Sequence, residues 1–245
     1  MKHRKITDKL RAELLALKTS RGTIDDFCSN YLSNFSENAQ VMHFALKGTQ
    51  AINSVAYSQY FVFLVSSLET FFRDIFIYIH SVDAELMDKL IEKFKITERL
   101  PNSEELTSIE VLSKSFNFQN LNDLESAFDQ VWGGRFLYTV INTSISPCGF
   151  NGKVFQHVCA KNHFPSWKNI LSETFSIRHK VVHDANFRPE SNMELARQAE
   201  SLFLLLPQIT TLVVAKKYKL KSVFLKSNGN DCPYIFSIHD ILAED

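Results

Sequence analysis

The sequence predicts an all-α protein whose long helices pack through aromatic side chains. The chain has 245 residues, a length that suits one large domain or two small ones. It contains only 7 glycines and 6 prolines, whereas a β-sandwich or barrel needs a turn roughly every 8–12 residues and uses more of both. Phenylalanine occurs 21 times. The scarcity of turn residues and the abundance of large apolar rings therefore favour a helical core.

Charge and cysteine content constrain the partners and the compartment. The 27 basic side chains balance 27 acidic ones, which argues against coating of nucleic acid by bulk electrostatics but allows a small basic site. The four cysteines are far apart and form no C-x-x-C motif, as in reduced intracellular proteins. The most apolar runs, 60–68 and 202–215, are too short to span a bilayer. We expect a soluble, cytoplasmic protein.

Apolar spacing predicts three helices in the N-terminal third of the chain. Residues 6–18 and 24–46 each show helical spacing, and Gly48 can end the second helix. Between residues 53 and 80 the apolar positions fall on one broad stripe, which predicts a buried core helix. The positions of this stripe are Phe61, Leu64, Val65, Leu68, Phe72, Ile75, Phe76 and Ile79.

The segment 84–165 is predicted to be a helical insertion between two core helices. Short helices are expected at 84–95, 103–115 and 121–131, and the Trp132-Gly-Gly sequence breaks the last of them. Residues 143–168 contain two prolines and two glycines and are expected to form a loop. The insertion could serve as a lid, a specificity element or additional core.

The C-terminal third predicts two more helices and a small appendage. One helix starts near Trp167 and runs to about Ala185, and the next covers 191–218, opens with a capping-box pattern and is kinked at Pro207. Beyond it, two short apolar runs flank an Asn-Gly sequence, which predicts a β-hairpin. Residues 1–218 are thus expected to form one domain, and 219–245 a hairpin tail.

An arginine lies on the apolar face of the helix predicted near 167–185. Arg178 falls near the middle of that face, and burial of a guanidinium is costly unless a carboxylate or a functional cavity compensates for it. Glu69, beside the stripe of 53–80, is the candidate carboxylate. The alternative for Glu69 is an ion pair with Arg73 at i+4. The face itself is defined by Leu171, Thr174, Val181, Val182 and Ala185.

A histidine follows this arginine at a spacing that separates the two side chains. His183 lies five positions after Arg178, which is about 140° of rotation on an unbroken helix. A joint role therefore needs one of two arrangements. Either the helix ends or distorts near His183, or a second protomer places its own pair alongside.

Two groups of residues could be considered as metal sites. His179 and His183 have the i, i+4 spacing of zinc ligands, but the glutamate of an H-E-x-x-H motif is missing between them. The second group matches no ligand spacing and consists of Cys148, His157, Cys159 and His163. We predict neither a metal nor a cofactor.

The segment from Arg178 to His183, of sequence RHKVVH, resembles the R-polar-x-x-x-H signature of the HEPN superfamily of helical ribonucleases. The four residues between Arg and His fall within the range that this motif allows, and His179 takes the position that is usually polar. Ser67–Arg73 resembles the earlier family helix, in which an acidic residue often supports the active site. The resemblance covers about residues 40–80 and 165–218 and implies a HEPN-like helical bundle.

The resemblance implies a metal-independent endoribonuclease that acts as a homodimer through a composite site. His183 would accept the proton of the ribose 2′-OH, and Arg178 would stabilise the phosphorane, which leaves a 2′,3′-cyclic phosphate and a 5′-OH. Glu69 and His179 would support these two catalytic residues. The residues that would contact RNA are Lys180, Asn186 and Arg188.

The biological role implied is that of a toxin or defence effector that cleaves cellular RNA, for which an antitoxin or another partner protein is a candidate partner. Two alternatives stay open. The chain could be a non-catalytic module of the same family that binds a partner protein or a nucleotide. It could also be an unrelated helical interaction protein in which the R-x4-H spacing is a coincidence.

Overall fold

The computed structural model describes residues 23–93, 108–114, 116–147, 158–184, 186–189, 192–220 and 235–242. Within these ranges the chain is helical except for one two-stranded ladder, so the all-α prediction is confirmed. The elements are α2 (Ile24–Ala45), α3 (Gln50–Val82), α4 (Ala84–Lys93), α5 (Ser108–Ser113), α6 (Leu121–Trp132), α7 (Phe136–Asn142), β1 (Ser144–Ile145), β2 (Val158–Cys159), α8 (Ala160–His163), α9 (Trp167–His183), α10 (Met193–Lys217) and α11 (Ile238–Leu242).

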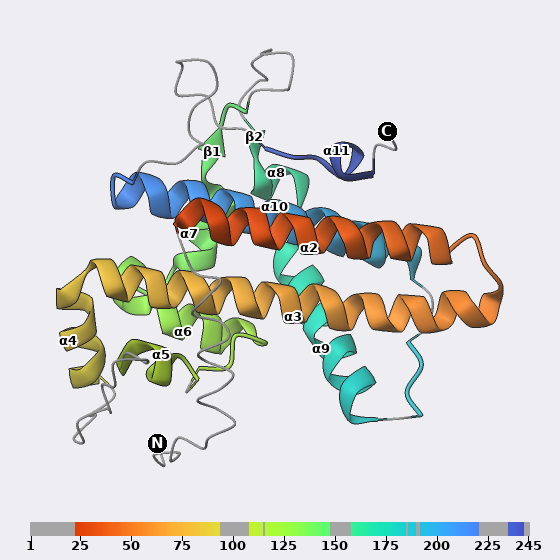
Figure 1. Cartoon of the computed structure of the whole chain (residues 1–245), viewed down its shortest axis with the longest axis horizontal. Coiled ribbons are helices and arrows are strands. Elements are labelled where there is room, and N and C mark those ends of the chain that lie inside the picture. Colours follow the sequence, from red (N-terminus) through yellow and green to blue (C-terminus); the bar gives the residue numbers. More distant parts are fainter. Residues whose placement is uncertain are drawn as a thin grey trace.

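Three long helices form the body of the molecule. Figure 1 shows α2 and α3 running antiparallel through a short turn, with α10 along α2 and α9 crossing α3. The turn closes at Gly48, whose N–H donates to the Ala45 carbonyl at 2.9 Å. A side chain at Gly48 would place its Cβ 3.0 Å from that carbonyl oxygen, so the predicted role of this glycine in ending the helix has a steric basis.

The predicted core stripe is the most buried part of α3. All eight of its positions are at most 1% exposed, as the i, i+3, i+4 spacing requires for a helix covered along one face. The helix itself is longer than the predicted 53–80 and has 33 residues. Neighbouring aromatic residues such as Phe71 widen the buried face.

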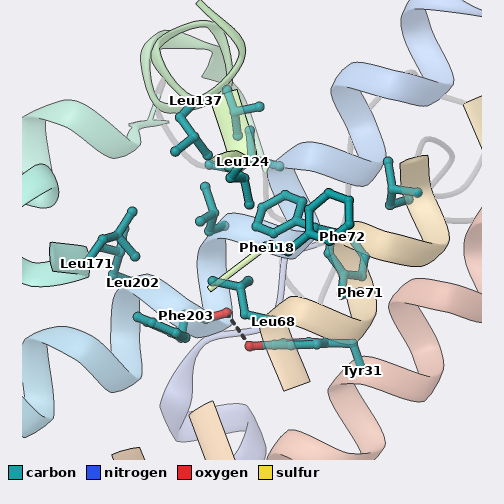
Figure 2. Packing of buried hydrophobic residues seen from close by; sticks show 14 of the residues in the cluster. Tyr31, Leu68, Phe71, Phe72, Phe118, Leu124, Leu137, Leu171, Leu202 and Phe203 are labelled. Carbon is teal, nitrogen blue, oxygen red and sulfur yellow. Dashed lines mark hydrogen bonds between the residues drawn. The ribbon is translucent and has the colours of Figure 1, made fainter. Parts of the chain in front are cut away.

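The inserted segment supplies much of the aromatic core. Phe128 and Phe136 stack with ring centroids 4.1 Å apart, and Phe72 of α3 meets Phe136 edge-on at 5.8 Å. Figure 2 shows Phe118 of the same segment beside Phe72. Because these rings share one continuous cluster with the long helices, the described part of 84–165 is additional core.

The structure corrects the expected loop before α9. Residues 143–168 include β1 and β2, which pair antiparallel with Ser144 opposite Cys159, and the short helix α8. The helix α7 was also not predicted, because β-branched and aromatic residues give its sequence little helical preference. A carboxylate of α6 compensates: Glu125 accepts a hydrogen bond from the Leu137 N–H at 3.1 Å. α7 is therefore stabilised by a tertiary contact and not by the helical preference of its own residues.

The remaining C-terminal predictions are confirmed in part. The helix expected at 191–218 is α10, capped by the Asn192 side chain, which accepts from the Leu195 N–H at 3.0 Å. Pro207 lies inside α10. The expected helix 6–18 and most of the expected hairpin, 221–234, lie outside the described residues.

The described end of the tail is helical. It forms α11, which packs on α2, where Gln40 donates to the Ile241 carbonyl at 3.4 Å. Just before this helix, the Phe236 N–H donates to the Gln208 side chain at 2.8 Å. Residues 235–242 therefore close over the core by a helix and not by a strand.

α10 has the length and composition of a membrane-spanning helix, which revises the expectation that its apolar run is too short. It has 25 residues and a mean hydropathy of 1.3 in its most apolar window, and 78% of that window is buried inside the molecule. A core helix has the same properties. Among the described residues it is the one helix that meets both criteria.

A buried carboxylate joins the three long helices. Glu200 of α10 accepts from the Tyr60 hydroxyl of α3 at 2.6 Å and lies 3.0 Å from Nε2 of His43 on α2. Burial, followed by the Glu200 charge, raises the pKa of Tyr60 well above its ordinary value, so the phenol remains a hydrogen-bond donor. Figure 2 shows a second contact of this kind, in which the Tyr31 hydroxyl donates to the Phe203 carbonyl.

Replacing Glu200 by alanine should lower the free energy of unfolding by about 2–4 kcal/mol, because Tyr60 and His43 lose their shared acceptor. Urea denaturation followed by circular dichroism measures the change. The matched control is Glu194→Ala on the exposed first turn of the same helix, which should cost less than about 1 kcal/mol. Equal losses in both variants would contradict a stabilising role for this cluster.

His80 near the end of α3 is a buried histidine with one unpaired nitrogen. Its side chain is 4% exposed, Nδ1 lies 2.8 Å from the Phe76 carbonyl oxygen, and Nε2 has no hydrogen-bond partner among the described residues. Since a carbonyl only accepts, Nδ1 carries the proton of the neutral ring. Burial lowers the pKa of His80 by more than the Phe76 carbonyl and the Asp83 carboxylate raise it.

Because the pKa of His80 is lowered, the free energy of unfolding should decrease as the pH falls. The unfolded chain binds a proton at His80 below about pH 6.5 whereas the folded chain does not, so acidification from about pH 7 to about pH 5 should favour unfolding. The variant His80→Asn keeps an N–H group for the Phe76 carbonyl and does not titrate. Its free energy of unfolding, measured by urea denaturation at each pH, should fall less than that of the wild type. Parallel pH profiles would contradict the prediction.

Candidate functional site

The helix that carries the R-x4-H motif is buried at its start and exposed at its end. The first half of α9 packs into the core, where Phe175 meets Phe203 edge-on at 6.3 Å. Towards the C-terminus the side chains emerge, and Val182 is 47% exposed. Figure 1 shows this end of α9 extending beyond the body of the bundle. The motif therefore lies where α9 leaves the core.

Arg178 occupies the position on α9 where core becomes surface. Its side chain is half-buried, and Nε is buried without a hydrogen-bond partner among the described residues. Thr174 and Val182, four residues to either side, share its face of the helix. The expected inward face is thus correct at Thr174, which is fully buried, and wrong at Val182, because α9 continues past the edge of the bundle. Ala185, also expected on this face, lies outside the described residues.

Glu69 does not compensate for the charge of Arg178. Its carboxylate pairs with Arg73 at 2.5 Å, one turn along α3, and it also accepts a hydrogen bond from Gln119 of the inserted segment. Within the described ranges it forms no ion pair with Arg178. The alternative i, i+4 pair is therefore the one that forms, and it belongs to the junction between α3 and the segment that precedes α6.

His183 lies in the last turn of an undistorted helix. α9 continues through His183, and the Asp184 N–H donates to the Lys180 carbonyl at 2.8 Å. The expectation that the helix ends near His183 is therefore confirmed, but no distortion precedes this end, and His183 itself is still helical. The two side chains stand about 140° apart around the axis, so one chain by itself does not place them in one cleft.

Two histidines lie side by side at this end. The rings of His179 and His183 have centroids 4.5 Å apart, and both side chains are exposed. No group of three histidine, cysteine, aspartate or glutamate side chains suited to a metal ion occurs among the described residues, so the pair has no third ligand there.

The chain after α9 folds back onto the helix. The Asp184 side chain accepts from the Asn186 N–H at 2.9 Å, and the Lys180 ammonium lies 5.5 Å from the centroid of the Phe187 ring. Arg188 donates to the Phe187 carbonyl at 2.8 Å. The three residues expected to contact RNA are thereby gathered at the same end of α9, each of them exposed.

A tyrosine that was not predicted as a site residue binds the other end of the segment between α9 and α10. The Tyr57 hydroxyl of α3 donates to the Asn192 carbonyl at 2.8 Å and accepts from the Asn192 N–H at 3.1 Å. Burial raises the pKa of Tyr57, with a smaller contribution from Glu173 on α9. Because Tyr57 belongs to a long predicted helix that contains several aromatic residues, no signal in the sequence distinguishes it from an ordinary core residue.

Comparison of the chain with family models, with curated proteins and with solved structures finds no match. The chemistry available at the end of α9 is therefore inferred from its own residues.

Replacing Tyr57 by phenylalanine should lower the free energy of unfolding by about 1–2 kcal/mol, because both backbone groups of Asn192 lose a partner. The amides at the start of α10 should also exchange faster with solvent. Urea denaturation and hydrogen exchange measure the two effects. The control Tyr138→Phe removes a hydroxyl from a side chain that is 46% exposed and should change stability by less than about 0.5 kcal/mol. Unchanged exchange at α10 would contradict the assigned contact.

Proposed function

We propose that this protein is a metal-independent endoribonuclease of the HEPN type, with Arg178 and His183 as its catalytic pair in a homodimer. The observation that carries the proposal is the position of Arg178, whose guanidinium has a buried nitrogen without a partner on the helix face that leaves the core. Nε itself is shielded, but the side chain is only half-buried, so the other N–H groups of the guanidinium can bind an anion, and RNA phosphate is the anion whose cleavage the R-x4-H motif suggests.

The chemistry requires one base and one cation. The imidazole of His183 accepts the proton of a ribose 2′-OH, whose oxygen attacks the adjacent phosphorus and displaces the 5′ oxygen of the next nucleotide. Arg178 donates to the non-bridging oxygens and stabilises the charge of the phosphorane. His179, whose ring lies 4.5 Å from that of His183, orients the base. Lys180, with its positive charge one turn before Asp184, contacts the RNA backbone beside it.

A second copy of the chain completes the site. Arg178 and His183 point in directions about 140° apart on one helix, so the pair that acts on one phosphate combines Arg178 of one protomer with His183 of the other. Val182 supports this arrangement, because an apolar side chain that is 47% exposed on the face of Arg178 gains from being covered. Glu69 is held by Arg73 and Gln119, so we assign it to the stability of α3 and not to catalysis.

A non-catalytic role in binding a partner protein is the second candidate. It is favoured by apolar side chains that are more than half exposed where α2 meets α3, an exposure typical of interaction surfaces. They are Val41, Phe44, Ile52 and Val55. A partner that covers them could also be the antitoxin of the ribonuclease.

The ribonuclease proposal predicts that the purified full chain cleaves total cellular RNA in EDTA, leaving 2′,3′-cyclic phosphate and 5′-OH ends. The variants Arg178→Ala and His183→Ala should each lower the rate at least about 100-fold. The matched control His239→Ala removes an exposed histidine of α11 and should retain full activity.

Mixing the two inactive variants tests the composite site. In a heterodimer of Arg178→Ala and His183→Ala one of the two sites has both residues intact, so an equilibrated equal mixture should recover about a quarter of the wild-type rate. No recovery despite subunit exchange would place both residues in one chain. Failure of a folded, dimeric wild type to cleave RNA would refute the enzyme and favour the binding role.

A further inference from the structure

Basic and aromatic side chains gather around α7, on a part of the surface that the motif at the end of α9 does not use. This group is called the α7 surface below. Its basic members are exposed. Of its two aromatic residues, Tyr138 is exposed and Trp132 is half-buried. The basic residues are Arg135, Lys161, Lys168 and Lys217, and the aromatic residues are Tyr138 and Trp132.

Two of the lysines lie over the two rings. The Lys161 ammonium of α8 is 5.6 Å from the centroid of Tyr138 on α7, and the Lys217 ammonium at the end of α10 is 5.3 Å from the centroid of Trp132. A cation at this distance is attracted to the face of the ring. Each pair therefore holds a positive charge beside an aromatic ring.

Both pairs contact α7, one through Trp132 and the other through Tyr138. Trp132 packs against Phe136 in the first turn of α7, with ring centroids 5.0 Å apart. Arg135, the residue just before α7, and Tyr138 are three positions apart and share one side of the helix. Figure 1 shows α7 in the same region as α6, α8 and α10, the elements that supply the other members.

Four exposed basic side chains belong to the α7 surface although the net charge of the chain is zero. Burial raises the pKa of Glu125. The nearby positive charge of Lys168, at the start of α9, lowers this pKa by a smaller amount. Glu125 is itself directed at the backbone of α7, where it accepts from the Leu137 N–H at 3.1 Å. The carboxylate of Glu125 is therefore directed into the protein, whereas the basic side chains of the α7 surface are exposed.

We propose that the α7 surface binds single-stranded RNA. Protein surfaces that bind single strands combine cations for the phosphates with rings on which unpaired bases stack, and the α7 surface has both. Tyr138 is 46% exposed, so part of its side chain is open to solvent. A duplex keeps its bases stacked inside the helix and an acidic peptide has none, so neither would use the rings.

The α7 surface and the proposed catalytic motif share helix α9. Lys168 and Arg178 lie on the same helix ten residues apart, which corresponds to about 15 Å along α9. A strand held at α7 can therefore continue along α9 to its exposed end. This inference rests on the proposed function for the choice of RNA as the ligand, but the binding it describes does not require cleavage.

Binding is tested with two fluorescent probes of about 12 nucleotides, an oligoadenylate and an abasic strand with the same number of phosphates. The full chain carries His183→Ala and EDTA is present, so no cleavage interferes. Fluorescence anisotropy is measured over a range of salt concentrations. The charge controls are Lys47→Ala and Lys89→Ala, each of which removes an exposed lysine far along the chain from α7.

The oligoadenylate should bind more tightly than the abasic strand. Lys161→Ala with Lys168→Ala should weaken both probes and reduce the slope of log affinity against log salt by about 0.7 for each lysine. Tyr138→Ala should weaken the oligoadenylate between about 5- and 150-fold and leave the abasic strand unchanged. Both controls should bind like the parent protein.

Three results would overturn the proposal. Equal affinity of the parent protein for both probes would exclude stacking of bases on these rings. Unchanged affinity in the Lys161 and Lys168 double variant would place any binding elsewhere. Tighter binding of a polyglutamate peptide than of the oligoadenylate would assign the surface to an acidic protein. If the wild type does not cleave RNA but the oligoadenylate still binds, the ribonuclease proposal is contradicted and the proposal for the α7 surface is not.

Discussion

The burial of α3 along almost its whole length is the constraint on which the rest of the structure depends. A helix of 33 residues is about 50 Å long, more than any single partner helix of this chain covers. Its first half meets α10, where Tyr60 donates to Glu200, and its second half is covered by rings such as Phe128 and Phe136 of the inserted segment. The insertion is therefore required by the length of the apolar stripe.

The candidate site likewise depends on how much of a helix is covered by its neighbours, because α9 extends beyond the elements that pack against it. α9 is amphipathic throughout, but the bundle covers only its first half, so the apolar face continues into solvent at Val182. Arg178 lies at the transition, and a guanidinium there keeps part of its surface in water while one nitrogen is shielded. A residue in this position is neither a core residue nor an ordinary surface charge, which makes it suitable for binding an anion or a second protomer.

The net charge of zero does not describe where the individual charged side chains lie. Carboxylates such as Glu69, Glu125 and Glu200 are engaged in contacts inside the molecule, with Arg73, with the backbone of α7 and with Tyr60. Many lysines, in contrast, extend from the surface, where they meet aromatic rings or solvent. The basic members of the α7 surface and Lys180 near the end of α9 are exposed, so they can meet an approaching polyanion although the net charge is zero.

The sequence alone determined the helical class, the approximate positions of the long helices and the buried face of α3, because these follow from the local spacing of apolar residues. It also located the R-x4-H motif on α9. Only the tertiary structure decided that Glu69 pairs with Arg73, that α7 is a helix stabilised by Glu125, and that α9 leaves the core before Val182. These outcomes depend on contacts between residues distant in the chain, which the periodicity of a single helix does not record.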